Sequence, residues 1–239
     1  MGVIEYLALA AFLIVVLLTF RLYFDTQPKR DYNPVRFMAR IAVFGAIATV
    51  LYVVPIFNLS LPFFPSFLKV HIDEIPAFIA GFAYGPLAGG AVIAIKTGMK
   101  FVLGGSNTMG VGELTDLILS SVYVLTATFI YNKKRNLKGV ALGFGVATVL
   151  QVVVAMFINV YWMIPFYMNV MHYPLDALLK MMQATNPSIT DVGWSYAFFA
   201  VLPFNLFKDA IVIVVTFIMY RSLHVYLRFD KKGKKKAGR

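Results

Sequence analysis

The sequence predicts an all-α membrane protein, and three observations support this fold class. Hydrophobic residues make up 60% of the 239 residues and the mean hydropathy is +0.76, which exceeds what soluble globular chains show. Apolar stretches of roughly 20 residues, each long enough to cross a bilayer core of about 30 Å, alternate with polar connections. The basic residues gather in blocks beside these stretches.

The blocks of basic residues predict the orientation in the membrane. The chain has 22 Lys and Arg against 11 Asp and Glu, a net charge of +11. Most of the basic residues lie within 21–40, 133–138 and 221–239. Cytoplasmic loops of membrane proteins are enriched in Lys and Arg, so we expect a multi-pass cell-membrane protein with its N-terminus outside and its C-terminus cytoplasmic. We expect the basic blocks to contact anionic lipid headgroups of the bilayer, and we expect no nucleic-acid partner.

The apolar segments divide the chain into four parts. We expect residues 1–24 to form an additional N-terminal transmembrane helix that is retained, because no basic segment precedes it and no small-x-small cleavage site follows it. Residues 25–36 form a cytoplasmic linker, residues 37–225 a six-helix membrane domain, and residues 226–239 a basic cytoplasmic tail. In the domain, residues 73–103 are expected to form two membrane spans hinged at Gly85-Pro86.

Two connections differ from simple turns. Residues 57–72 contain four phenylalanines and two prolines that prevent a continuous helix, so this loop covers a cavity or lies at the membrane surface as part of an aromatic belt. Residues 166–194 contain a short amphipathic segment that lies flat on the membrane or over a pocket mouth. Its apolar face consists of Leu175, Leu178, Leu179 and Met182.

A polar trio interrupts the last apolar segment: Asn205, Lys208 and Asp209. Residues three and four apart share a helix face, so the three side chains are expected to project together. An ionisable group at membrane depth costs roughly 2.5 kcal/mol or more and marks a functional site that faces a cavity. The alternative is a structural Lys–Asp pair that holds helices together.

Four polar residues fall near the outer half of the membrane in this topology: Glu113, Asn159, Asn205 and Lys208. We expect them to converge under the two outward loops on a pocket lined by aromatic residues and methionine. A mostly apolar cavity with a few placed donors and acceptors suits a small planar molecule. Asparagine offers a paired donor and acceptor and lysine a charged donor, which fits a heteroaromatic ring with carbonyl and imide edges.

Enzymatic and metal chemistry find little support in the sequence. It contains no Ser-His-Asp pattern, no phosphate-binding P-loop motif, no cysteine and only three dispersed histidines, so we expect no catalytic residues, cofactor or metal ligands. Asp73 and Glu74 are adjacent, and their side chains point about 100° apart on a helix. We expect them to cap or be solvated at a helix N-terminus, where negative charge is favoured.

Five motifs resemble the substrate-binding (S) subunits of energy-coupling-factor (ECF) transporters, closest to their riboflavin-specific group. The motifs span residues 63–69, 73–77, 81–89, 110–114 and 202–208. The resemblance covers about residues 37–225 and implies a six-helix S-component core that captures a vitamin on the outer side. It further implies high-affinity riboflavin uptake, with riboflavin as the transported ligand, and docking on a transmembrane coupling subunit driven by two ATPase subunits.

The resemblance also implies roles for single residues. Ligand contacts are expected from Asn159, Asn205 and Lys208. The loop at 57–72 is expected to act as a gate, with its residues Phe63, Phe64, Phe67 and Lys69. The coupling face falls on Ala42 and Ala46, whose small side chains let another helix approach closely.

Three features depart from the family pattern. The helix at 3–24 is additional, Thr115 and Asp116 stand where Ala and Asn are expected, and the connection at 166–194 is longer. The ligand could therefore be another vitamin or a flavin nucleotide. A different class of protein, a non-transport scaffolding or assembly factor, would use its small-residue faces and basic tail and would tolerate Asn205→Ala and Lys208→Ala.

Overall fold

The computed structural model describes residues 33–106 and 108–236, with side chains through Met219. The predicted helix at 1–24, residues 25–32 of the predicted linker and the side chains of the predicted tail lie outside the described residues. The chain divides into two units, Met1–Met38 and Ala39–Arg239. Residues 33–38 belong to the first unit, where Pro34 begins a helix, and the described residues of the second unit hold the features analysed below.

Apart from two short helical pieces in the loops, six helical segments follow one another along the described residues, as predicted for the membrane domain. They are α2 (Pro34–Val53), α3 (Glu74–Tyr84), α4 (Pro86–Gly104), α5 (Val111–Lys133), α6 (Leu137–Ile158) continued by the π-helical turn η2 (Asn159–Met163) and α7 (Ile164–Asn169), and α9 (Trp194–Tyr196) continued by the π-helical turn η3 (Ala197–Val201) and α10 (Leu202–Lys236). Among them, all but α3 form segments long and apolar enough to cross a membrane. The all-α membrane fold is confirmed.

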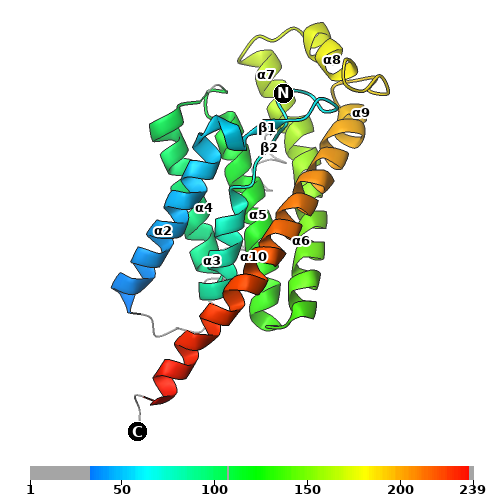
Figure 1. Ribbon diagram of the computed structural model, residues 1–239. Helices are drawn as coiled ribbons and strands as arrows, with labels where there is room; N and C mark the ends of the chain where they lie inside the picture. Colours follow the sequence, from blue (N-terminus) through cyan, green and yellow to red (C-terminus); the bar gives the residue numbers. More distant parts are fainter. Residues whose placement is uncertain (1–32, 107, 237–239) are drawn as a thin grey trace. The chain divides into compact units, whose positions relative to one another are not determined.

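The first of the two spans predicted within 73–103 is too short to cross a membrane: α3 is a short apolar helix surrounded by protein. It packs against α4, α5 and α10, and Figure 1 shows it among these three helices. Every residue from Glu74 through Phe82 is buried. Its 11 residues span only about 16 Å at 1.5 Å per residue, so α3 ends inside the bundle. Its N-terminus therefore lies where the other helices can contact it.

A glycine and a proline separate α3 from α4, which confirms the predicted hinge. Gly85 has φ of +106°, a backbone conformation that glycine adopts without steric cost. Its N–H donates to the carbonyl of Gly81 at 2.9 Å, which ends α3. Pro86 then opens α4 at a position where the missing N–H costs no helical hydrogen bond.

Two short elements at one end of the domain were only partly anticipated. The loop at 57–72 follows a 3₁₀ turn, η1 (Pro55–Phe57), and forms an antiparallel ribbon of β1 (Leu59–Ser60) and β2 (Lys69–Val70). No strand was expected in this loop, because its prolines exclude a helix but do not indicate how the two arms of the loop pair. Helix α8 (Leu175–Gln183) occupies the predicted amphipathic segment, at the same end as the ribbon (Figure 1).

Aromatic rings fill the space between α3, α5 and α6. Phe78 lies edge-on to Tyr123 at 4.8 Å between ring centroids, and 4.9 Å from Phe144. Phe82 extends the cluster to Tyr131 at 5.0 Å. Such pairs add about 0.5–1.5 kcal/mol beyond the apolar area they bury. The cluster ties the enclosed helix α3 to α5 and α6.

Helices α5 and α6 approach each other closely at Gly143. A Cβ added there would lie 2.7 Å from the carbonyl oxygen of Ala127, a backbone atom that cannot rotate away. Gly145 lies two residues further along α6, and a Cβ added there would meet no atom within 4 Å. The two positions form a matched pair for testing the helix contact.

Gly143→Ala should destabilise the protein by about 1–3 kcal/mol, because overpacking forces the two helices apart. Gly145→Ala should leave stability unchanged or raise it by up to about 1 kcal/mol, because alanine is the better helix former. Thermal unfolding of both variants in the same detergent, followed by intrinsic fluorescence, measures the difference. Equal melting temperatures for the two variants would contradict the close contact.

Candidate functional site

One end of the domain contains a cavity of about 530 Å³. This volume falls in the range of about 300–1,000 Å³ that small-molecule pockets occupy. Its wall comes from α4, α5, η2 and α10, together with the loop that carries the β-ribbon and with α8. All four residues predicted to face a ligand line it: Glu113, Asn159, Asn205 and Lys208. The structure thus brings together side chains from three helices that lie far apart in the sequence.

Asn159 is held in place by a neighbouring tyrosine and by its own helix. Its Nδ2 donates to the carbonyl of Ala155 at 2.9 Å, and its Oδ1 accepts from the hydroxyl of Tyr196 at 3.1 Å. Asn159 begins η2 and Tyr196 directly precedes η3; such π-helical turns are frequent at functional sites. An amide carries two N–H hydrogens and two oxygen lone pairs, so Asn159 keeps donor and acceptor capacity for a ligand.

Asn205 has a matching arrangement on the facing helix. Its Nδ2 donates to the carbonyl of Val201 at 2.8 Å, and its Oδ1 accepts from Nε2 of Gln151 at 3.0 Å. Gln151 is fully buried, so its amide fixes which face of Asn205 turns to the cavity. Two pre-oriented amides therefore lie on the cavity wall, each with unused donor and acceptor positions.

Lys208 forms a buried ion pair at the cavity wall. Its ammonium donates to Oε1 of Glu74 at 2.8 Å, and Ser120 donates to the same oxygen at 3.0 Å. Lys208 is 6% exposed and Glu74 1%. The pair joins α10 to the first turn of α3 and holds the ammonium beside the cavity.

A second buried lysine, Lys96, continues this network. Its ammonium contacts Asp73, Asp116 at 2.8 Å and the Ser120 hydroxyl at 3.2 Å. The prediction that Asp73 and Glu74 cap or are solvated at a helix N-terminus is wrong: both side chains are buried in ion pairs, and Asp73 makes no capping hydrogen bond. The reason is that α4, α5 and α10 enclose the N-terminus of α3 and bring two lysines to it.

The polar trio of the last helix does not act as one cluster. Asn205 and Lys208 line the cavity, whereas Asp209 is fully buried and does not line it. Adjacent residues on a helix point about 100° apart. The orientation of α10 that directs Lys208 toward the cavity therefore turns Asp209 away from it. The structural Lys–Asp pair is also not what forms, because the partner of Lys208 is Glu74.

Glu113 lies near the start of α5 and is held by the preceding loop. Its Oε2 accepts from the Ser106 hydroxyl at 2.6 Å and from that of Thr108 at 3.3 Å. Negative charge is favoured at a helix N-terminus. The loop before α5 thus orients a carboxylate toward the cavity.

The residues of the predicted gate divide into two groups. Phe67 and Lys69 line the cavity, and the Phe67 ring lies 6.0 Å from Tyr196 and 6.4 Å from Tyr167. Phe63 and Phe64 do not line it and pack against α10 instead, Phe63 edge-on to Phe207 at 6.3 Å and Phe64 edge-on to Phe204 at 5.3 Å. Phe67 therefore contributes an aromatic ring to the cavity lining, and the other two phenylalanines attach the loop to the last helix.

The predicted coupling residues lie on α2, away from the cavity. Ala42 and Ala46 are both exposed. They are available for contact with lipid or with another chain.

Several cavity residues were not predicted as site residues, among them Tyr52, His71, Lys100 and Asp116. Lys100 and Asp116 are ionisable residues inside apolar helices, a pattern that marks functional sites. His71 gives no comparable signal, because it lies in the loop before α3. Burial lowers the pKa of His71, which favours a neutral imidazole beside the carboxylates of Asp73 and Asp116.

Removing one partner of the Lys208–Glu74 pair should destabilise the protein by about 3–5 kcal/mol, because it leaves a buried charge uncompensated. We expect Lys208→Met and Glu74→Gln each to lower the melting temperature, and the double variant to lose about 0.5–3 kcal/mol less than the sum of the two. A double-mutant cycle of thermal unfolding gives this coupling. Strictly additive losses would show that the ion pair does not form.

Known proteins resemble this chain in sequence and fold. The family described as "ECF transporter, substrate-specific component" matches residues 36–220. The riboflavin transporter FmnP of Bacillus subtilis is 26% identical over 196 residues, covering 81% of this chain and 96% of that protein. The riboflavin transporter RibU of Staphylococcus aureus is 25% identical over 191 residues, covering 79% of this chain and 92% of that protein.

A solved structure shares the fold. It is described as "Structure and mechanism of the S component of a bacterial ECF transporter" and aligns with a TM-score of 0.63 at 24% identity, covering 82% of this chain and 99% of that one. The apolar helices and the family agree on a multi-pass membrane protein that serves as a transport subunit rather than an enzyme. Since the family match covers most of the chain, this protein belongs to the substrate-specific components of ECF transporters.

Proposed function

We propose that this chain captures riboflavin with high affinity and is the riboflavin-specific subunit of an ECF transporter. The observation that carries the proposal is the convergence of two pre-oriented amides and one ammonium, from Asn159, Asn205 and Lys208, on a cavity of about 530 Å³. The names of the B. subtilis and S. aureus relatives, which are riboflavin transporters, support the same ligand.

The chemistry of the cavity suits a flavin. The ring system of riboflavin is planar, with carbonyl and imide groups on one edge and methyl groups on the opposite edge. The amides of Asn159 and Asn205 pair with an imide edge, and the Lys208 ammonium donates to a carbonyl oxygen. Phe67, Tyr167 and Phe204 supply aromatic surface, and the carboxylate of Glu113 accepts hydrogen bonds from ribityl hydroxyls.

The cavity is proposed to open to the outside of the cell. In this orientation the N-terminus lies outside and the C-terminus in the cytoplasm, which places the basic blocks on the cytoplasmic side. The ribbon loop with Phe67 and Lys69 then acts as the gate over the ligand. Helix α8 contributes Leu178 to the cavity wall and forms a second part of the cover.

Energy for uptake is proposed to come from other chains. The sequence has no P-loop motif, so this subunit does not bind ATP through one. A transmembrane coupling subunit would dock at Ala42 and Ala46, where the exposed small side chains allow close helix approach, and two ATPase subunits would drive it.

A phosphorylated flavin is the second candidate ligand. Lys69 and Lys100 both line the cavity, and lysine is a common phosphate-binding residue. The same binding assay compares riboflavin with flavin mononucleotide, and tighter binding of the nucleotide would select it.

Truncating the polar residues should weaken riboflavin binding. We expect Asn159→Ala, Asn205→Ala and Lys208→Ala each to cost about 1–3 kcal/mol, because polar ligand atoms lose their partners. Quenching of flavin fluorescence during titration of purified protein gives the dissociation constants. Asn169→Ala is the matched control, since Asn169 is exposed and does not line the cavity.

The same assay tests the gate. Phe67→Ala should speed flavin dissociation, because Phe67 lines the cavity, whereas Phe63→Ala should do so less, because Phe63 is 55% exposed and contacts α10 instead. A protein that binds no added flavin at all would remove the flavin assignment.

Leucine at the two alanines of α2 should separate binding from transport. We expect the double variant Ala42→Leu and Ala46→Leu to keep riboflavin affinity but to lose cellular uptake at least tenfold, because larger side chains block helix approach. Ala141→Leu, at an exposed alanine of α6, is the control. A scaffolding protein would instead tolerate Asn205→Ala and Lys208→Ala in its cellular function.

A further inference from the structure

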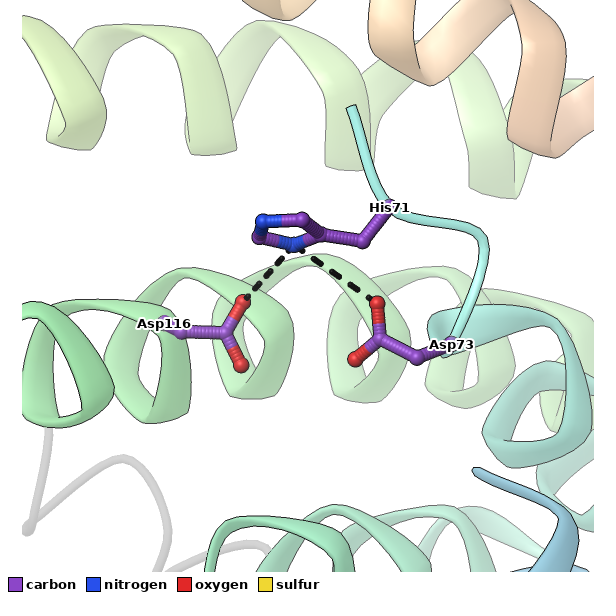
Figure 2. A group of neighbouring side chains, drawn as sticks. All are labelled: His71, Asp73 and Asp116. Carbon is purple, nitrogen blue, oxygen red and sulfur yellow. Dashed lines mark ion pairs between the residues drawn. The ribbon is translucent and has the colours of Figure 1, made fainter. Parts of the chain in front are cut away.

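Three potential metal ligands from different segments meet at the cavity wall. Nδ1 of His71 lies 3.7 Å from Oδ1 of Asp73 and 3.9 Å from Oδ1 of Asp116, and one ligand atom of each residue lies within 4.8 Å of the others. Figure 2 shows the imidazole facing both carboxylates, with His71 on the loop before α3, Asp73 at the start of α3 and Asp116 on α5. His71 and Asp116 line the cavity.

Two of these ligand atoms are buried without a hydrogen-bond partner among the described residues: Nδ1 of His71 and Oδ1 of Asp73. Asp73 is 0% exposed, so water from the bulk does not compensate its free oxygen. A buried carboxylate oxygen without a partner is costly. The separation of 3.7 Å between these two atoms is too long for a direct hydrogen bond. It leaves room for an atom that bridges them.

The charge around this position is unbalanced. Among the residues that the structure describes, the carboxylates of Asp73, Glu74 and Asp116 form ion pairs with two ammonium groups, those of Lys96 and Lys208. Lys96 contacts the Oδ2 atoms of both aspartates. Oδ1 of Asp73 faces His71, and Oδ1 of Asp116 faces His71 and also accepts from the Ser120 hydroxyl at 3.4 Å. A further cation at the Oδ1 atoms would offset the remaining negative charge.

We propose that His71, Asp73 and Asp116 bind a divalent transition-metal ion of the Zn²⁺ type. A neutral imidazole with two carboxylates is a ligand set that such ions accept. Bonds of about 2.0–2.2 Å place tetrahedral ligand atoms roughly 3.4 Å apart, so small side-chain rotations bring the three atoms onto one ion. Because His71 and Asp116 face the cavity, the fourth coordination position opens toward it.

The test uses the full chain, purified without added flavin and titrated with Co²⁺, a spectroscopic probe that Zn²⁺ then displaces. We expect one Co²⁺ per chain, with visible absorption bands of a low-coordinate nitrogen and oxygen site. His71→Gln should weaken binding at least tenfold and reduce these bands. His172→Gln is the matched control, because His172 is exposed and does not line the cavity, and it should leave both unchanged.

Two further variants separate the site from a structural effect. Asp73→Asn should also weaken Co²⁺ binding at least tenfold. This variant could fail to fold because Lys96 loses a partner. In that case His71→Gln decides the test, because it leaves the contacts of Lys96 unchanged. Lys96→Met should strengthen Co²⁺ binding, because an ammonium that repels the ion is removed.

The proposal is overturned if wild-type protein shows no saturable Co²⁺ binding, or if His71→Gln binds Co²⁺ as tightly as wild type. Binding that occurs only in Lys96→Met would also overturn it, since the Lys96 ammonium would then be the only cation that this position holds. The outcome is independent of flavin capture: a chain that binds Co²⁺ but no flavin contradicts only the proposed function.

Discussion

The buried ion network at the N-terminus of α3 is the constraint on which the site depends. Removing charges from water costs several kcal/mol for each ion, and only close partners with further hydrogen bonds offset this cost. Lys208 with Glu74, and Lys96 with Asp73 and Asp116, satisfy that condition through Ser120, which contacts both groups. The arrangement holds only while α4, α5 and α10 surround the first turn of α3, so the network specifies the relative positions of these helices.

Two of these helices also carry residues predicted to face a ligand: Glu113 lies on α5, and Asn205 and Lys208 lie on α10, whereas Asn159 belongs to η2. Each cavity amide donates to a carbonyl of its own helix and accepts from a side chain of another element. Their orientation is therefore set before any ligand arrives, which lowers the entropic cost of binding. Lys208 is fixed in the same way by Glu74. The cavity is thus lined on one side by long helices with fixed polar side chains. On the other side it is lined by the ribbon loop and the short helix α8.

The division between wall and cover suits a protein that captures a small molecule and later releases it. The wall consists of long helices joined by buried polar contacts, and the cover consists of two-residue strands and a nine-residue helix. Short elements with few buried residues open at lower free energy than packed helices. Phe67 links the loop to the helices, because its ring lies near Tyr167 of α7, which lines the cavity, and near Tyr196 of α9.

Local patterns in the sequence sufficed for part of this description. Apolar length predicted the helices, the Gly85-Pro86 pair predicted the hinge, and the three-residue spacing of Asn205 and Lys208 predicted that they share a face. These features depend on residues close together in the chain, whose geometry the helix period dictates. The prediction for Asp73 and Glu74 was wrong because it used only their position at the start of a helix, which suggested capping. Their ion-pair partners Lys96 and Lys208 lie far away in the sequence.

The remaining features depend on contacts across long stretches of chain. Glu74 and Lys208 are 134 residues apart, and His71 reaches Asp116 from a different segment. No periodicity relates such positions, so only the packing of α3 among its neighbours decides which charges pair and which face the cavity. The pairing of β1 with β2 is decided in the same way, because two-residue strands have too little pattern of their own. Composition and periodicity thus determine that this chain forms apolar helices with polar residues at membrane depth, and the packed bundle alone determines which of those residues meet.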